Sequence, residues 1–196
     1  MNEDDDAPLI EGCRRGEARS YQRLYDKYSG KVYGFARRFL GDEQHAEDVT
    51  QEVFLRVFRK LSTFRGDSRF STWLFRVSLN SCKNKRRSLD RDQRFDPERF
   101  QRSRPEAEAS PERHIACQAL QGRIDQALEH LSEGQRSVLL LKAVEELSYR
   151  EIGAIFGESE NQIRGKLYRA RKAFRSALAE LEGCPENRLA ETVGVT

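Results

Sequence analysis

The fold of this chain is decided by residues 148–171, which read SYREIGAIFGESENQIRGKLYRAR. Ser148 and Glu151 have the spacing Ser-x-x-Glu, a capping box that starts a helix. The short apolar segment that follows meets Gly157, where a residue without a Cβ lets the backbone reverse. The next segment has a helical apolar stripe of Ile163 and Leu167. Two short helices joined at a glycine predict a helix-turn-helix, whose second helix enters the major groove of DNA.

The polar side of this second helix is basic. Arg164, Tyr168 and Arg171 recur at steps of three and four residues, so they share one helix face. An arginine can form two hydrogen bonds to guanine, and a tyrosine can contact a phosphate or a thymine methyl group. We therefore expect this face to contact DNA, and a basic face that is only solvated is the alternative. The expected contacts are Arg164, Lys166, Tyr168, Arg169 and Arg171.

The first half of the chain has helical periodicity as well. Apolar residues from Ala18 to Phe39 recur at steps of three and four. Gly30 and Gly34 lower the helix propensity there, which leaves either a kink or two shorter helices open. A second helix is expected from about Gln44 to Leu61, with a buried valine stripe of Ala46, Val49, Val53, Val57 and Leu61. A third is expected from a cap at Ser71 or Thr72 to a basic cluster near Arg87.

No segment has the pattern of a strand, so we expect an all-α fold of two small helical domains joined by a flexible linker. Residues 89–119 contain three of the five prolines and few aliphatic side chains, which is typical of a linker. Residues 132–135 are expected to cap the helix that carries the apolar run 138–141. The expected parts are an acidic N-terminal segment (1–12), a first domain (13–88), the linker (89–119), a second domain (120–182) and a C-terminal tail (183–196).

Aromatic and basic residues alternate between residues 64 and 87. Flat rings stack on unpaired bases while cations hold the backbone, and Asn80 or Ser81 has polar groups that can read the edge of an extruded base. Trp73 and Phe75 also fit a hydrophobic core, whereas the loop 64–70 is harder to explain by packing. The candidate residues for binding unpaired DNA are Phe64, Arg65, Asp67, Ser68, Phe70, Trp73, Asn80, Lys83, Arg86 and Arg87.

Composition excludes several classes of protein. The four cysteines lie far apart and form no Cys-x-x-Cys pair, which argues against a zinc ribbon and against a disulfide framework. His114 and Cys117 could form half of a metal site, but the sequence contains no second half. No apolar run approaches the ~20 residues that a membrane helix needs, and residues 1–6 are acidic where a secretory signal is basic. We therefore expect a cytoplasmic protein without membrane insertion. The absence of a phosphate loop and of any histidine triad predicts no catalytic residue, metal or cofactor.

Two blocks of sequence together resemble the extracytoplasmic-function sigma factors of the sigma-70 family. The first block runs from Tyr21 to Arg87 and includes AEDVTQEVF at residues 46–54 and FRGDS at residues 64–68. The second block runs from Leu131 to Arg171 and includes QRSVLLL at residues 135–141. The two blocks occur in the family's order and with its spacing, and they cover a little over half of the chain.

The resemblance implies an alternative sigma factor, which binds core RNA polymerase, recognises the −35 and −10 promoter elements and promotes melting without ATP. Asp48, Gln51 and Glu52 lie opposite the valine stripe of their helix. By resemblance they match the face that docks on the β′ clamp helices of the polymerase. The β flap of the polymerase is a second contact in the family. The loop 64–70 and Asn80 match the surface that captures a flipped −10 base, and residues 83–87 would hold nearby backbone. The helix from Arg164 to Arg171 matches the −35 reader. An anti-sigma factor is the third expected partner, and the short linker leaves no room for the middle domain of housekeeping sigma factors.

Two other classes of protein remain open at this point. A stand-alone helix-turn-helix regulator would bind duplex DNA without polymerase. A nuclease would use Asp48 and Glu52 to hold Mg²⁺, although one helix turn makes a poor two-metal site.

Overall fold

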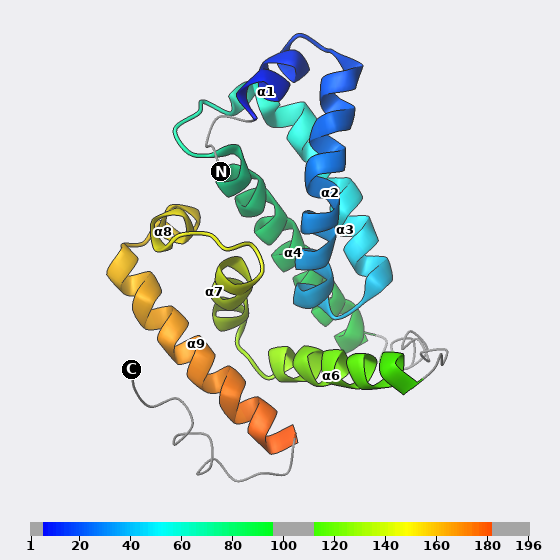
Figure 1. The fold of residues 1–196 in the computed structure, drawn as a ribbon, viewed down its shortest axis with the longest axis vertical. Helices are drawn as coiled ribbons and strands as arrows, with labels where there is room; N and C mark the ends of the chain where they lie inside the picture. Colours follow the sequence, from blue (N-terminus) through cyan, green and yellow to red (C-terminus); the bar gives the residue numbers. More distant parts are fainter. Residues whose placement is uncertain (1–5, 96–111, 182–196) are drawn as a thin grey trace.

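The computed structural model describes residues 6–95 and 112–181, and within these ranges it contains helices and no strand (Figure 1). The expected all-α fold is therefore confirmed. None of the described helices is long and apolar enough to cross a membrane. The helices are α1 (Ala7–Arg14), α2 (Ala18–Leu40), α3 (Glu43–Lys60), the 3₁₀ turn η1 (Leu61–Thr63), α4 (Phe70–Phe95), α6 (Glu112–Glu129), α7 (Glu133–Ala143), α8 (Tyr149–Phe156) and α9 (Glu160–Leu181).

Helices α2, α3 and α4 pack against one another and form the core of the first domain. The apolar stripe of α2 is buried from Tyr28 to Phe39, whereas Tyr25 is 38% exposed, and the helix runs unbroken through Gly30 and Gly34. Each interior glycine costs about 1 kcal/mol of helix propensity, and burial of a stripe that contains Phe35 and Phe39 outweighs this cost. Gly41 ends the helix with φ 78°, a left-handed conformation that favours glycine.

Helix α3 begins and ends within one residue of the predicted bounds. The side chain of Asp42 accepts a hydrogen bond from the backbone N–H of His45 at 2.7 Å and caps the first turn. The predicted buried stripe is present, because its five members are each at most 2% exposed: Ala46, Val49, Val53, Val57 and Leu61.

Helix α1 begins within the segment 1–12, which the sequence suggested only as an acidic N-terminal stretch, and continues two residues past it. Ile10 and Cys13 are buried, and the Tyr21 hydroxyl donates a hydrogen bond to the Cys13 carbonyl at 2.7 Å. Asp6, just before the helix, forms an ion pair with Lys27 at 2.7 Å and accepts a hydrogen bond from the Tyr28 hydroxyl. The N-terminal segment is thus fastened to α2.

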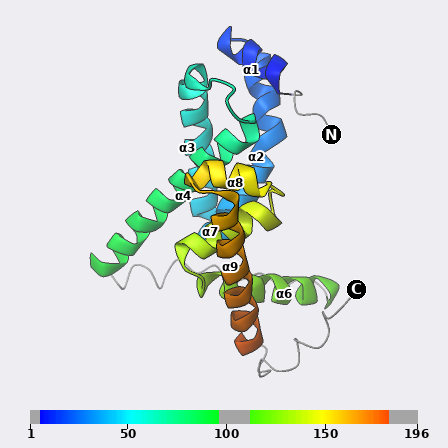
Figure 2. The same cartoon turned by 90° about the vertical axis from the view of Figure 1, so that its left-hand side faces the viewer.

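Helix α4 differs from the prediction at both ends. It begins at Phe70, so Ser71 and Thr72 lie inside its first turn and neither is the cap that we expected. It continues to Phe95, eight residues past the predicted end at Arg87, and extends beyond the other helices of its domain (Figure 2). The segment between α4 and α6, residues 96–111, lies outside the described residues, as does the tail from residue 182.

The second domain contains α6 to α9, and both predicted capping residues cap their helices. Ser132 and Gln135 form a capping box at the start of α7, and Ser148 and Glu151 form one at the start of α8. Each box satisfies two backbone N–H groups that have no partner inside the helix.

The two domains touch, which the sequence did not predict. Helix α4 contacts α7 and α8, and α2 contacts α6 and α7. Buried apolar side chains from both domains form one cluster that extends from Ile10 to Ala170. The division into residues 13–88 and 120–182 therefore remains a sequence prediction, and the described helices share a core.

Candidate nucleic-acid interface

The helix-turn-helix predicted from the sequence is present. Gly157 ends α8 with φ 71° and donates its N–H to the Gly153 carbonyl. The backbone N–H of Ser159 then donates to the side chain of Gln162 at 2.8 Å at the start of α9. Gly153 was missed by the sequence reasoning, although it is essential to the turn: a Cβ at this position would lie 2.5 Å from the Glu158 carbonyl oxygen. Its spacing four residues before Gly157 was the available signal.

Helix α9 exposes the face that the sequence assigned to DNA. Arg164, Arg169 and Arg171 are exposed, and Tyr168 is 68% exposed. Ile163 and Leu167 are buried on the opposite side, so packing fixes the direction in which the basic face points. An exposed tyrosine among arginines is suited to hydrogen bonds with phosphates and base edges.

Tyr149, at the start of α8, lies beside the exposed face of α9. The guanidinium of Arg164 lies over the Tyr149 ring, 5.4 Å from its centroid. The two residues line an open groove of about 480 Å³. Its other lining residues are Leu167, Tyr168, Arg171, Phe174 and Arg175.

Lys166 does not lie with the exposed arginines. Its ammonium forms an ion pair with Glu158 in the turn and lies 5.4 Å from the centroid of the Phe156 ring. Glu158 occupies the position where an apolar residue usually packs, and one of its carboxylate oxygens is buried without a hydrogen-bond partner in the described residues. The structure therefore assigns Lys166 to the turn, which corrects its expected place on the DNA face.

The aromatic rings of loop 64–70 are packed in the core, which corrects the expectation that they are free to stack on bases. Phe64 and Phe70 are 7% and 3% exposed, and their centroids lie 5.8 Å apart in an edge-to-face contact. Trp73 is half-buried beside both, 5.5 Å from Phe64. Burial of these large apolar rings is favourable, and the side chains that the loop exposes to solvent are polar. The exposed side chains are Arg65, Asp67 and Arg69, and Ser68 is half-buried.

Helix α4 carries the remaining candidates for the −10 element. Asn80 and Arg87 are exposed, whereas Ser81 is fully buried and is not available to read a base. Lys83 forms an ion pair with Glu133 at 3.2 Å, and Arg86 donates to the Phe39 carbonyl at 3.5 Å. Two of the four predicted polar groups on this helix therefore already have partners within the molecule.

The exposed face of α3 contains Asp48, Gln51 and Glu52, as the spacing predicted. Asp48 forms an ion pair with Lys85 at 3.1 Å, and Glu52 pairs with Arg56 one turn later. Leu55, 55% exposed on the same side, was missed. Its place outside the valine stripe was the available signal, because helical periodicity puts a side chain at that position on the exposed side.

The described residues hold no cluster of three metal-ligating side chains. Cys13 and Cys82 are buried free thiols, and burial raises the pKa of both. The side chains of His114, Cys117 and Cys184 lie outside the described residues.

Comparison with known families agrees with this arrangement. The family model "Sigma-70 region 2" matches residues 24–92, and "Sigma-70, region 4" matches residues 121–174. These are the two regions of an RNA polymerase sigma factor.

Related proteins place the chain more finely. The RNA polymerase sigma-H factor of Pseudomonas aeruginosa is 35% identical over 188 residues, covering 92% of this chain and 97% of the relative. The ECF RNA polymerase sigma-E factor of Escherichia coli K12 is 32% identical over 185 residues, covering 90% of this chain and 95% of the relative. The chain therefore belongs to the extracytoplasmic-function group of the sigma-70 family, and it serves transcription initiation as a polymerase subunit, not as an enzyme.

Solved structures show the same fold. CnrH, in complex with the cytosolic domain of CnrY, has a TM-score of 0.69 and 25% sequence identity, covering 89% of this chain and 97% of that chain. The sigma factor RpoE of Bartonella quintana, in complex with the anti-sigma factor NepR, has a TM-score of 0.64 and 21% identity, covering 82% and 98%.

Proposed function

We propose that the chain directs core RNA polymerase to promoters by reading the −35 element with α9 and the −10 element with loop 64–70 and α4. The observation that supports the proposal is that this one chain of the sigma-70 family has both the exposed Arg–Tyr face of α9 and the polar loop before α4. A duplex-reading helix and a surface for unpaired bases are the two elements that a promoter-opening factor needs.

Arg164, Tyr168, Arg169 and Arg171 are the proposed contacts to the −35 duplex. They are exposed, and the guanidinium fork can approach guanine from the major groove. Lys166 contributes indirectly, because its ion pair with Glu158 steadies the turn that aims α9.

The proposed −10 surface consists of the loop side chains Arg65, Asp67 and Ser68 together with Trp73 and Asn80. Phe64 and Phe70 support this surface from the core and do not touch DNA themselves. Cations further along α4, at Lys83, Arg86 and Arg87, would hold the phosphate backbone. Binding energy gained on the unpaired strand drives melting, and no hydrolytic step is needed.

The exposed face of α3 is the proposed polymerase contact, with Asp48, Gln51 and Glu52 around Leu55. An apolar side chain ringed by charged ones has the composition of an interface centre with a polar rim. We also propose an anti-sigma partner, since the sigma factor RpoE of Bartonella quintana, which has the same fold, was solved with the anti-sigma factor NepR.

The test is run-off transcription from genomic fragments with purified chain, core polymerase and nucleotides but no separate ATPase. Discrete transcripts that require both proteins are expected. Core polymerase alone and chain alone are the controls. Failure to bind core polymerase, together with tight footprints on duplex DNA, would contradict the proposal and identify a stand-alone regulator.

A further inference from the structure

The loop 64–70 begins and ends at two buried rings that contact each other. The centroids of Phe64 and Phe70 lie 5.8 Å apart, so the two ends of the loop are close in space. Between them Gly66 has φ 82°, a left-handed conformation in which the chain turns back. The polar side chains of residues 65–68 extend from this turn. Their direction therefore depends on how Phe64 and Phe70 are held.

The last turn of α1 contacts the first end of this loop. The guanidinium of Arg14 donates a hydrogen bond to the Phe64 carbonyl, across 50 positions of sequence. A charged donor makes this a strong type of hydrogen bond. The Phe64 carbonyl and the Arg65 N–H belong to one planar peptide unit, so the bond fixes the plane from which Arg65 begins. Helix α1 also packs against η1, the turn that leads into the loop (Figure 1).

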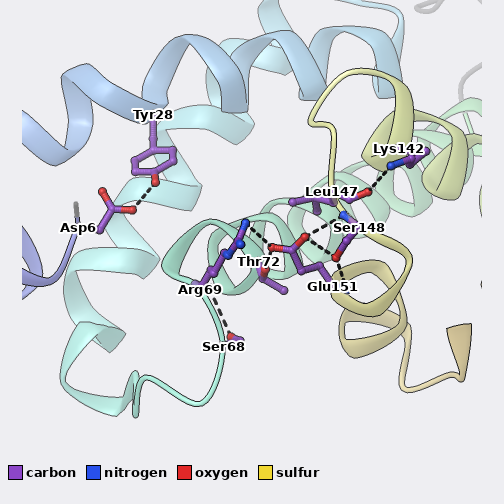
Figure 3. Close-up of polar contacts among 9 residues, drawn as sticks. All are labelled: Asp6, Tyr28, Ser68, Arg69, Thr72, Lys142, Leu147, Ser148 and Glu151. Atoms are coloured by element: carbon purple, nitrogen blue, oxygen red, sulfur yellow. Dashed lines mark hydrogen bonds and ion pairs between the residues drawn. The ribbon is translucent and has the colours of Figure 1, made fainter. Parts of the chain in front are cut away.

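The start of α1 reaches the other end of the loop through α2. Asp6 accepts a hydrogen bond from the Tyr28 hydroxyl (Figure 3) and forms an ion pair with Lys27 at 2.7 Å. The Tyr28 ring lies edge-to-face against Phe70, with the centroids 5.4 Å apart. The two ends of α1 are thus connected to the two ends of the loop.

Helix α1 is itself held closely against α2. A Cβ at Gly12 would lie 2.1 Å from the Ser20 hydroxyl oxygen, which shows how near the two helices come. Ile10 and Cys13 are buried on the same side. Close-packed elements of this kind transmit a displacement to their neighbours. The match to sigma-70 region 2 begins at residue 24 and does not include α1.

The second domain contacts the loop after its polar residues. Arg69 lies 3.5 Å from one carboxylate oxygen of Glu151, which also accepts from the Thr72 hydroxyl at 3.3 Å (Figure 3). The other oxygen of Glu151 caps α8 by accepting from the Ser148 N–H at 2.8 Å. Arg14 contacts the residue before the polar side chains, and Glu151 contacts the residue after them.

We propose that α1 is a positioning element for −10 recognition, in which Arg14 orients the loop and thereby sets how strongly its polar side chains discriminate between bases. The proposal rests on the proposed function of loop 64–70 in reading the −10 element. Arg14 is a positioning residue that acts through the Phe64 carbonyl. A recognition site needs its side chains held within about 0.5 Å of their productive positions, and hydrogen bonds to base edges weaken steeply when they are misaligned. Release of the loop should therefore reduce base discrimination.

The variants are made in the full-length chain. Arg14→Met removes the guanidinium but keeps an apolar stem, and Arg14→Lys keeps a charged donor. Arg15→Met is the matched control, because it removes the same charge at the next residue, whose 57% exposed side chain forms ion pairs with Glu11 and Glu17. Tyr28→Phe removes the hydroxyl that donates to Asp6 and keeps the ring.

Each variant is assembled with core polymerase, and run-off transcription is measured below saturation. The templates are a promoter mapped with the parent chain, its single-base variants in the −10 element and its single-base variants in the −35 element. Discrimination is the yield from the parent promoter divided by the yield from each variant template. Circular dichroism and urea denaturation report the fold of each chain.

Arg14→Met should lower −10 discrimination about threefold to tenfold, the range expected for one hydrogen bond, and leave −35 discrimination and helicity unchanged. Tyr28→Phe should lower it less, at the same positions. Arg14→Lys should recover part of the loss, and Arg15→Met should match the parent chain. Unchanged −10 discrimination in Arg14→Met would overturn the proposal. An equal loss of yield on every template would overturn it too, since that result identifies a phosphate contact or a damaged fold.

Asp67→Ala, within the loop, separates this proposal from the proposed function. If Asp67→Ala lowers −10 discrimination while Arg14→Met does not, only the positioning by α1 is wrong. If the parent chain shows no −10 discrimination, or Asp67→Ala leaves it unchanged, the proposed reading of the −10 element by this loop is wrong as well.

Discussion

Arg136 of α7 donates a hydrogen bond from Nη1 to the Phe39 carbonyl oxygen at 2.9 Å, across 97 positions of sequence. Its Nε donates to the Leu128 carbonyl at 2.8 Å, and its guanidinium lies 5.9 Å from the centroid of the Phe39 ring. Arg136 is 2% exposed, and burial lowers its pKa to about 10. A buried guanidinium thus joins the end of α2 to the second domain.

Replacing this guanidinium should destabilise the whole chain. Arg136→Met keeps most of the side-chain volume but removes the buried hydrogen bonds to the Phe39 and Leu128 carbonyls. These carbonyls keep only the Arg86 guanidinium at 3.5 Å and the Leu131 N–H at 3.2 Å, so we expect a cost of about 1–3 kcal/mol of unfolding free energy. Urea denaturation measures the change, and Arg150→Met at an exposed position is the control. A loss below about 0.5 kcal/mol, the range of ordinary surface changes, would mean that water replaces the guanidinium at both carbonyls.

Two glycines of the helix-turn-helix should respond in opposite directions to alanine. Gly153→Ala places a Cβ 2.5 Å from the Glu158 carbonyl oxygen, so backbone must shift, at a cost of about 1–3 kcal/mol. Gly165→Ala meets only the Arg169 side chain, at 3.6 Å, and should stabilise α9 by about 0.5–1 kcal/mol. Thermal unfolding of the pair checks both signs. Equal effects would show that the turn adapts without strain.

Base reading by α9 predicts a selective loss of binding. Arg164→Ala removes a guanidinium that lies over Tyr149 at the edge of the groove, and should cost roughly 1–3 kcal/mol while relaxing preference at one −35 position. Competition binding against a library of −35 variants measures the preference. A uniform loss over every sequence would identify a phosphate contact instead.

The exposed face of α3 should govern polymerase affinity without affecting the fold. Asp48→Ala with Glu52→Ala removes two exposed carboxylates, and about a tenfold loss of core-polymerase affinity is expected for a charged rim of this size. Adding Leu55→Ser should deepen the loss, because its apolar side chain lies at the centre. Co-purification titration measures affinity, with Asp26→Asn as control. A collapse of helicity in circular dichroism would show that these residues stabilise α3 instead.

Glu145 predicts a pH dependence of stability. Burial between the domains raises the pKa of its carboxyl to about 7, against the lowering effect of Lys31 and Arg38. The folded chain therefore binds a proton more tightly than the unfolded chain, and stability falls as the pH rises from the unfolded value of 4.5 toward 7. Glu145→Gln should raise the unfolding free energy at pH 8 by about 1 kcal/mol, after allowing for solvent screening of a carboxyl that is partly exposed, and leave it unchanged at pH 4. Urea denaturation at both pH values checks this, and equal gains at both would contradict the assigned pKa.

The sequence predicted correctly those features that depend only on residues close together within one helix or turn. The stripes of α2 and α3, both capping boxes and the turn at Gly157 depend on residues a few positions apart, where periodicity and capping are visible. Asp48, Gln51 and Glu52 were placed correctly on an exposed face for the same reason.

Features that depend on contacts between helices were missed or wrong. Phe64 and Phe70 looked like free rings because their burial depends on Tyr28 of α2, which contacts Phe70 from a distant part of the sequence. The contacts of Arg136 with Phe39 and of Glu151 with Arg69 join residues 97 and 82 positions apart, and no local pattern marks such pairs. Lys166 was misplaced because its partner Glu158 lies across a turn whose angle the sequence did not specify.

Glu151 performs two tasks with one carboxylate, since it starts α8 and meets α4 at the same time. A substitution at this residue therefore affects both contacts at once. Serine or alanine would remove both functions, and aspartate is one methylene too short to span them. Glutamine alone keeps the helix start and relaxes the contact between domains. Any other change at Glu151 therefore alters the start of the helix-turn-helix and the contact with α4 together, whereas the ion pair of Glu133 with Lys83 can be changed without removing the cap of α8.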